Sequence, residues 1–282
     1  MSVAVVTDSA TALPAAVAAA HDIALVPMGL SIGGLPVAES ALGLDELIAR
    51  FDEGVTTSGA SPGDFVKAIE GSQTGDGVVV ITLASALSST HRAALLAAEE
   101  ATGPVRVIDS QTAAGAEGLV AVAAARAAAG GADIEAVDAA ARRVIEGVRL
   151  VGALSTLEYL MRGGHIPSAA GWAARMLNVQ PLIELRHGKV RPLRPAFSRD
   201  AALERLVAMW RQSRPAEAAD LHLVAMHSLD GVDAQRLVDE VRREVEPVTC
   251  FLSGFGTSLV AHTGPGLVGL AWWWEPTAQA PG

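Results

Sequence analysis

Cysteine is almost absent from this chain of 282 residues, and the single Cys250 excludes an intrachain disulfide. A protein without disulfides fits a reducing compartment, so we expect a cytoplasmic location. The first apolar run has no basic segment before it, and we expect no signal peptide. No apolar stretch reaches the roughly 20 residues that a membrane-spanning helix needs, which argues against an integral membrane protein.

Positive charge is also scarce, since 21 Lys and Arg stand against 31 Asp and Glu and the net charge is −10 at pH 7. Such a chain repels a phosphate backbone at long range, so nucleic acid is not an expected partner. The sequence lacks the glycine-rich P-loop pattern, the HExxH pattern and any dense cluster of metal-ligating side chains. We therefore expect neither a metal ion nor a cofactor.

Hydrophobic residues make up half of the chain, which is longer than one core usually organises. In the first half, apolar β-rich runs alternate with Ala-rich helical runs, as in a parallel sheet with crossover helices. Later, two apolar runs flank His187-Gly188, which is a two-residue hairpin signal. We predict a two-domain α/β fold, with an N-terminal parallel-sheet domain over residues 1–149 and a smaller C-terminal mixed-sheet domain over 150–282. A ligand is expected in the cleft between them.

Three clusters of hydroxyl groups follow predicted strands, where ligands of parallel sheets bind, and a fourth, Thr56 to Ser58, precedes a predicted helix. Any one such cluster is typical of a helix N-cap, but four together exceed what capping requires. The four clusters are Thr7 to Thr11, Thr56 to Ser58, Ser85 to Thr90, and Asp109 to Thr112.

Ser88 precedes a predicted helix over residues 93–101, so its hydroxyl would lie at the positive end of a helix dipole. The four clusters contain no Lys or Arg, and the first cation is Arg92, just beyond the third of them. That composition favours a singly charged head group, such as a carboxylate, over a phosphate.

Two enzyme-like motifs are better explained as structure. Gly59 to Gly63 matches the G-x-S-x-G pattern of α/β-hydrolases, but Pro62 has no N–H to serve as oxyanion donor. Residues 51–58 also do not form a convincing strand, and Ser61 instead fits a helix N-cap. Gly254 to Gly256 could open a dinucleotide site, but a third glycine is missing and a strand-like run follows where a helix is needed.

His262 lies between two predicted strands, where a turn-supporting or core histidine is as reasonable as an imidazole that donates to a carboxylate. Its surroundings belong to a set of motifs that extends along nearly the whole chain. The motifs are Thr7 to Ser9, Thr57 to Asp64, Ser85 to Thr90, Leu157 to Ile166, Leu177 to Pro181, and Ala261 to Gly266.

Through these six ordered motifs the chain resembles the DegV family of bacterial lipid-binding proteins. The resemblance implies that a long-chain fatty acid is threaded between the domains, with its carboxylate on Thr57 and Ser88 and with His262 nearby. It also implies that the protein is not itself an enzyme. Instead it would be the lipid-presenting subunit of a fatty acid kinase, whose separate ATP-binding catalytic subunit phosphorylates the carboxylate.

The sequence departs from the family pattern at three places, one of which is His91-Arg92, where Tyr-Gln is common. Ser89 replaces a usual glycine and adds a side chain beside the expected carboxylate, and His165 replaces a usual arginine on a surface associated with kinase docking. In the helical run that follows, Trp172 and Met176 are candidates for the wall of the tail pocket.

Two other functions remain open. One is a lipid sensor with a partner that is not a kinase, in which the domains close on the ligand. The other is a stand-alone hydrolase or phosphotransferase that uses Asp8 or Asp109 near Ser88, although no base adjacent in sequence accompanies a nucleophile.

Overall fold

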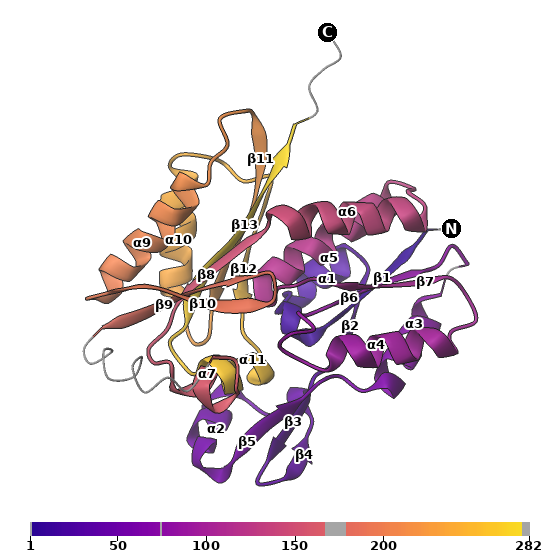
Figure 1. The fold of residues 1–282 in the computed structure, drawn as a ribbon, viewed down its shortest axis with the longest axis horizontal. Helices are drawn as coiled ribbons and strands as arrows, with labels where there is room; N and C mark the ends of the chain where they lie inside the picture. The colour runs from indigo at the N-terminus through magenta and orange to yellow at the C-terminus, as the bar shows by residue number, and fades with distance from the viewer. Residues whose placement is uncertain (1, 74, 167–178, 278–282) are drawn as a thin grey trace.

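The computed structural model describes residues 2–73, 75–166 and 179–277, and it confirms an α/β fold with a parallel sheet and a mixed sheet (Figure 1). The parallel sheet has the strand order β2-β1-β6-β7, and every neighbouring pair in it is parallel. Its strands are β1 (Ala4–Asp8), β2 (Ile23–Val26), β6 (Val78–Thr82) and β7 (Val105–Asp109).

Helices cover both faces of the parallel sheet, which is why the central strand β6 is completely buried and shows no alternation of apolar and polar residues. Helices α5 and α6 pack on one face, and α3 and α4 pack on the other. The helices of this half are α1 (Ala15–Ala20), α3 (Pro62–Ser72), α4 (Thr90–Glu100), α5 (Ala114–Ala129) and α6 (Ile134–Gly147).

The mixed sheet has the order β10-β9-β8-β13-β11-β12, in which only β11 and β12 pair in parallel. The predicted hairpin between β9 and β10 is confirmed, and both turn residues have positive φ, 50° at His187 and 70° at Gly188. Its elements are β8 (Arg149–Ala153), β9 (Gln180–Arg186), β10 (Lys189–Ala196), α9 (Arg199–Gln212), β11 (Ala219–His227), α10 (Val232–Arg242), β12 (Thr249–Gly254) and β13 (Val268–Pro276).

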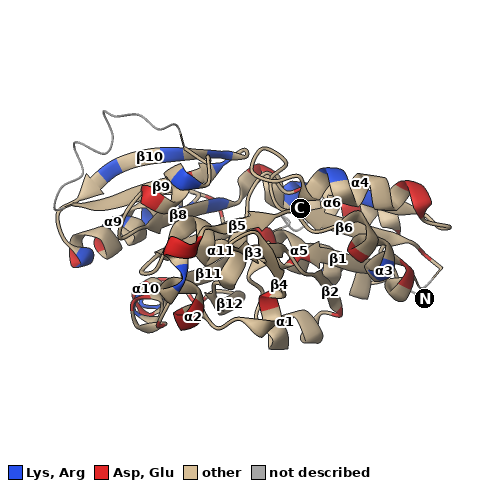
Figure 2. Ribbon diagram, turned by 90° about the horizontal axis from the view of Figure 1, so that it is seen from below, with Lys and Arg blue, Asp and Glu red and all other residues tan. Residues whose placement is uncertain are grey.

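The outer strand β10 carries Lys189, Arg191 and Arg194, which Figure 2 shows as blue bands along one edge of the mixed sheet. Pro192 and Pro195 in the same strand remove two backbone donors. Charge and proline on an edge strand disfavour pairing with another chain, so this edge ends the sheet.

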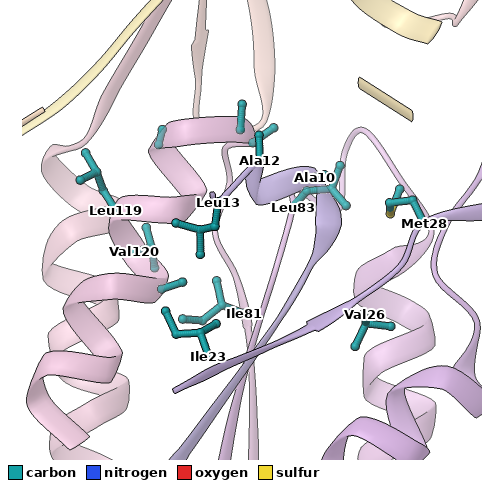
Figure 3. Close-up of a cluster of buried hydrophobic side chains, with 14 of the residues drawn as sticks. Ala10, Ala12, Leu13, Ile23, Val26, Met28, Ile81, Leu83, Leu119 and Val120 are labelled. Atoms are coloured by element: carbon teal, nitrogen blue, oxygen red, sulfur yellow. The ribbon is translucent and has the colours of Figure 1, made fainter. Parts of the chain in front are cut away.

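Helix α5 joins the two sheets, because it packs against β1 and β6 on one side and against β11 and β13 on the other. Small residues make this close approach possible: a Cβ atom on Gly115 would lie 2.6 Å from Cγ1 of Val224. On the side of the parallel sheet, Leu119 and Val120 belong to the buried cluster that also holds Leu13 and Ile81 (Figure 3).

A third, antiparallel sheet of three strands, in the order β4-β3-β5, was not predicted from the sequence. The interpretation of residues 51–58 was partly wrong, since Val55–Ser58 forms β5, which pairs with β3 alone. A strand of four residues with one partner gives little apolar alternation, although Val and Thr favour it. The elements around it are β3 (Gly29–Ile32), β4 (Leu35–Val37) and α2 (Leu44–Ala49), with 3₁₀ turns at Glu39–Ala41 and Phe51–Glu53.

A second correction concerns the run after Gly256, which is a helix, α11 (Thr257–Thr263), and not a strand. A run of seven residues with only three apolar side chains is too short to distinguish the two structures by periodicity. The helix ends at Gly264, where φ is 71° and where a Cβ atom would lie 2.2 Å from Cδ2 of Tyr159. That tyrosine belongs to α7 (Glu158–Arg162), which packs against α11.

Within the described ranges, none of the helices has both the length and the apolar character required to cross a membrane.

Candidate functional site

A cavity of about 320 Å³ lies between the carboxyl ends of the parallel strands and one face of the mixed sheet. Most of its lining is apolar and comes from both sheets and α11. None of the described residues that line it is Lys, Arg, Asp or Glu. The larger apolar lining residues include Leu83, Leu87, Leu150, Leu160, Ile183, Leu185, Met226, Phe255 and Leu267.

Polar side chains of the lining come from four segments that are distant in the sequence. Thr57 is supplied by β5, Ser88 and Ser89 by the turn before α4, His165 by the turn after α7, and His262 by α11. All three predicted segments thus lie on one cavity, and His165, which the sequence analysis treated only as a departure from the family pattern, lies there with them.

Thr57, His262 and His165 form a hydrogen-bonded chain. The hydroxyl of Thr57 lies 2.5 Å from Nε2 of His262, and Nδ1 of His262 lies 3.1 Å from Nε2 of His165. The two imidazole rings meet edge to face with centroids 4.5 Å apart. Gly163 permits this approach, because a Cβ atom there would lie 2.5 Å from Nδ1 of His262.

Burial keeps both imidazoles neutral. It lowers the pKa of His262 to about 4, and the neighbouring His165 lowers it further in the same direction. Burial alone lowers the pKa of His165. At neutral pH each ring therefore has one N–H donor and one acceptor nitrogen.

A second network of hydrogen bonds holds the hydroxyl of Ser88 beside the cavity. The buried hydroxyl of Thr90 accepts the N–H of Ala60 at 3.3 Å and lies 2.8 Å from the hydroxyl of Ser88. Ser88 Oγ also accepts the N–H of Thr90 at 3.2 Å. The one proton of the Thr90 hydroxyl has two acceptors within reach, Ser88 Oγ and, at 3.5 Å, Met28 Sδ. When it is donated to Ser88, the proton of Ser88 is free for a ligand. The sequence analysis included Thr90 in a hydroxyl cluster but gave it no role in the site, because a hydroxyl at this position is also typical of an ordinary helix start.

Ser89 occupies the N-cap position of α4 with helical dihedral angles, φ −75° and ψ −2°, so this position does not require glycine. Its side chain is exposed and makes no capping hydrogen bond. Its hydroxyl lies against Gly59, where a Cβ atom would come within 2.7 Å of it. The N–H groups of Ser88 and Ser89 donate to no other residue in the described ranges, which leaves them available beside the cavity.

The hydroxyls of Ser9, Thr11 and Ser110, in the other two clusters, are engaged in local hydrogen bonds and do not line the cavity. Ser9 donates to Glu39 at 2.6 Å, and Thr11 donates to the carbonyl of Asp8 at 3.0 Å. Ser110 makes a local turn with Thr112, donating to its carbonyl at 3.3 Å. These hydroxyls stabilise turns at the ends of β1 and β7.

Asp8 and Glu117 form a buried acidic pair behind the cavity. Burial raises the pKa of Asp8 to about 7, against the N–H groups of Leu83 and Ala10, which lower it. Burial and the charge of Asp8 raise the pKa of Glu117 well above its usual range. Because Asp8 accepts two backbone hydrogen bonds, Glu117 is the residue that holds the proton, and neither lines the cavity.

The G-x-S-x-G segment has the structural role predicted for it. Ser61 accepts the N–H of Asp64 at 3.1 Å as the N-cap of α3, and Pro62 occupies the first turn.

In the described part of the chain, no three His, Cys, Asp or Glu side chains gather as a metal site would require. The tail-pocket candidates Trp172 and Met176 lie outside the described residues.

Known proteins with this sequence pattern and fold are numerous. A family model described as "Uncharacterised protein, DegV family" matches residues 2–275. A DegV domain-containing protein of Streptomyces coelicolor is 37% identical over 95% of this chain and 97% of its own. A fatty acid-binding protein of Thermotoga maritima is 30% identical over 69% of this chain and 68% of its own. The structure of a DegV family protein from Thermus thermophilus, described for its fatty acid binding, superposes with a TM-score of 0.89 at 27% identity, covering 97% of this chain and all of that one.

Proposed function

This chain belongs to the DegV family, and from that premise we propose that it binds one long-chain fatty acid in the cavity and presents the carboxylate at the polar end. The observation that carries the proposal is a cavity with an apolar body and one polar end built of neutral hydroxyls and imidazoles. Such a lining matches a hydrocarbon tail with a single small head group.

The tail would supply most of the affinity. Each buried CH₂ group contributes about 0.8 kcal/mol, so a long acyl chain outweighs the ~1.5–3 kcal/mol of a charge-assisted hydrogen bond to its head group. The hydroxyls of Thr57 and Ser88 would then orient the carboxylate, with Ser89 and His262 beside it.

We further propose that the bound carboxylate is presented to a separate fatty acid kinase. Support comes from a second hollow, of about 250 Å³, on the outer side of the head-group end, which shares Thr57, Gly163 and His262 with the cavity and is also lined by Arg162. In this reaction a carboxylate oxygen attacks the γ-phosphorus of ATP, the bond to the β-phosphate oxygen breaks, and ADP leaves. The chain itself would be a non-catalytic subunit.

The proposal includes a head-group unit over residues 1–149, a second unit over residues 150–282 and a cytoplasmic location. The two units are supported by the change from alternating strand and helix patterns to a hairpin pattern in the second half, and the location by the single cysteine.

Mass spectrometry of lipid extracted from gently purified protein tests the binding proposal. We expect one fatty acid for each chain, and its reproducible absence would contradict the proposal.

Adding a candidate kinase subunit with ATP should convert the bound lipid to an acyl phosphate, trapped as a hydroxamate with hydroxylamine. Hydrolysis of acyl esters by the chain alone would indicate an enzyme instead.

A further inference from the structure

His165 and His262 are the only ionisable side chains among the described residues that line the cavity. They touch each other through Nε2 of His165 and Nδ1 of His262, and His262 touches Thr57 through its other nitrogen. The pair therefore lies where the proposed head group would be held, and it is the one group of the described lining that can become positively charged.

A fatty acid carboxylate is ionised at neutral pH, since carboxyl groups have pKa values of roughly 4 in water. Placing that anion in an apolar cavity is costly unless a positive charge or several donors compensate it. Lys and Arg are absent from the described lining. Either the ligand must take a proton, or the histidine pair must.

We propose that fatty acid binding draws one proton from solvent into the His165–His262 pair, so that the ligand is held as a carboxylate facing a shared imidazolium. This inference rests on the proposed function and assigns His165 as a positioning residue that acts through His262. The proton adds to the pair, no bond of the fatty acid is broken, and release of the lipid returns the proton to solvent.

The geometry fits this assignment because either ring can hold the extra proton without changing the contact with Thr57. With the charge on His262, Nδ1–H of His262 donates to Nε2 of His165, and with the charge on His165 this hydrogen bond is reversed. In both arrangements Nε2–H of His262 donates to Thr57. The Thr57 hydroxyl then turns its own proton to the carboxylate. If His262 instead accepted the proton of Thr57, that hydroxyl would be lost as a donor to the ligand.

The free protein is prepared for such a change. Burial lowers the pKa values of both histidines, so that the pair is neutral before the ligand arrives. An anion within a few ångströms favours the charged form of an imidazole and raises its pKa. The shift between the free and bound states is what couples binding to proton uptake.

Charged groups on the elements that pack against α11 do not replace this pair. Helix α7 presents the exposed ion pair Glu158–Arg162, with 2.7 Å between its atoms, and Tyr159. Glu39 accepts the N–H of Ser258 at the start of α11, and strands β3 and β5 carry no charged residue. Beside α2, Arg50 is paired with Glu46 and Glu53.

Calorimetry of palmitate binding at pH 7, in two buffers with different enthalpies of ionisation, measures the proton uptake. We expect close to one proton for each palmitate, and a dissociation constant that weakens by up to about tenfold per pH unit above pH 7. The carboxyl signal of [1-¹³C]palmitate should remain at the position of an ionised carboxylate. Nitrogen-15 spectra of the histidines should change to the protonated pattern when palmitate is added.

The matched variant is His165→Arg, whose guanidinium supplies a permanent charge at the same place. We expect proton uptake near zero and a dissociation constant almost independent of pH between 7 and 9. The proposal is overturned by the absence of uptake in the wild type, by a carboxyl signal of the protonated acid, or by equal uptake in this variant. If the variant does not fold, the wild-type carbon and nitrogen spectra decide alone. Failure of the wild type to bind palmitate at all would instead contradict the proposed function.

Discussion

The four hydroxyl clusters are of two kinds. At the ends of β1 and β7, an aspartate accepts backbone N–H groups, and the hydroxyls around it stabilise the turn. The clusters in β5 and before α4 contain no carboxylate, and their hydroxyls reach the cavity. A carboxylate satisfies the free amides of a turn and would repel an anionic head group, so the presence of Asp separates structural clusters from ligand-facing ones.

Asp8 and Asp109 make the same turn in different surroundings. Asp8 accepts from Ala10 and Leu83, each at 2.9 Å, and Asp109 accepts from Gln111 at 2.9 Å and from Ser85 at 3.1 Å. Asp8 is completely buried, whereas Asp109 is half-buried in a turn that water reaches. The same hydrogen bonds should therefore contribute very different amounts to stability.

The largest effect is expected from Asp8→Ala, which leaves two buried N–H groups without acceptors. Each such group costs about 1–3 kcal/mol, so we expect a loss of roughly 2–4 kcal/mol in the free energy of unfolding. Asp109→Ala should cost about 1 kcal/mol or less, because water replaces the carboxylate. Urea denaturation of both variants at pH 6 measures this difference, and equal losses would mean that burial does not distinguish the two turns.

The acidic pair should make stability depend on pH. The folded-state pKa of Asp8 is raised from 3.8 to about 7, so the folded chain binds more protons than the unfolded chain between those values. Stability from this pair is complete below about pH 4 and is lost as pH rises through 7. Relative to the wild type, Asp8→Asn, which removes the titrating carboxyl group, should therefore gain on the order of 2 kcal/mol on going from pH 5 to pH 8. Urea denaturation of both proteins at pH 5 and pH 8 measures this change. If their free energies of unfolding differ by the same amount at both pH values, the pKa of Asp8 is not raised by folding.

Much of the fold follows from local sequence, whereas the way its parts meet does not. Strand β6 is a continuous apolar run, and the turn at His187-Gly188 has the chemistry of a hairpin, so both are predictable. Helix α11 packs against α7, α2, β3 and β5, and its end at Gly264 fits against Tyr159 of α7, contacts that its own sequence does not contain. Thr57 and His262 were each suggested by motif, but their contact joins residues 205 positions apart, which no local pattern contains.

Within the ligand-facing clusters, Thr57 and Thr56 provide a matched pair. Thr57 faces the cavity, and Thr56 points outward to Ser31, with 2.7 Å between their hydroxyl oxygens. A charge-assisted hydrogen bond is worth ~1.5–3 kcal/mol, so we expect Thr57→Val to weaken palmitate binding by about 10- to 100-fold. Thr56→Val should leave the dissociation constant within about twofold. Titration with a fluorescent fatty acid would show this, and equal affinities of the two variants would argue against Thr57 as a head-group ligand.

Ser88 and Ser85 test the comparison within one turn. Ser88 lies on the cavity, whereas Ser85 is exposed and donates to Asp109, so it belongs to the structural turn of β7. We expect Ser88→Ala to weaken palmitate binding by about tenfold, less than Thr57→Val, because the N–H groups of Ser88 and Ser89 remain beside the head group. Ser85→Ala should leave binding unchanged and cost only a few tenths of a kcal/mol in stability. If instead Ser85→Ala reduced affinity as much as Ser88→Ala, the turn would act as a whole, and an aspartate partner would no longer identify a hydroxyl as structural.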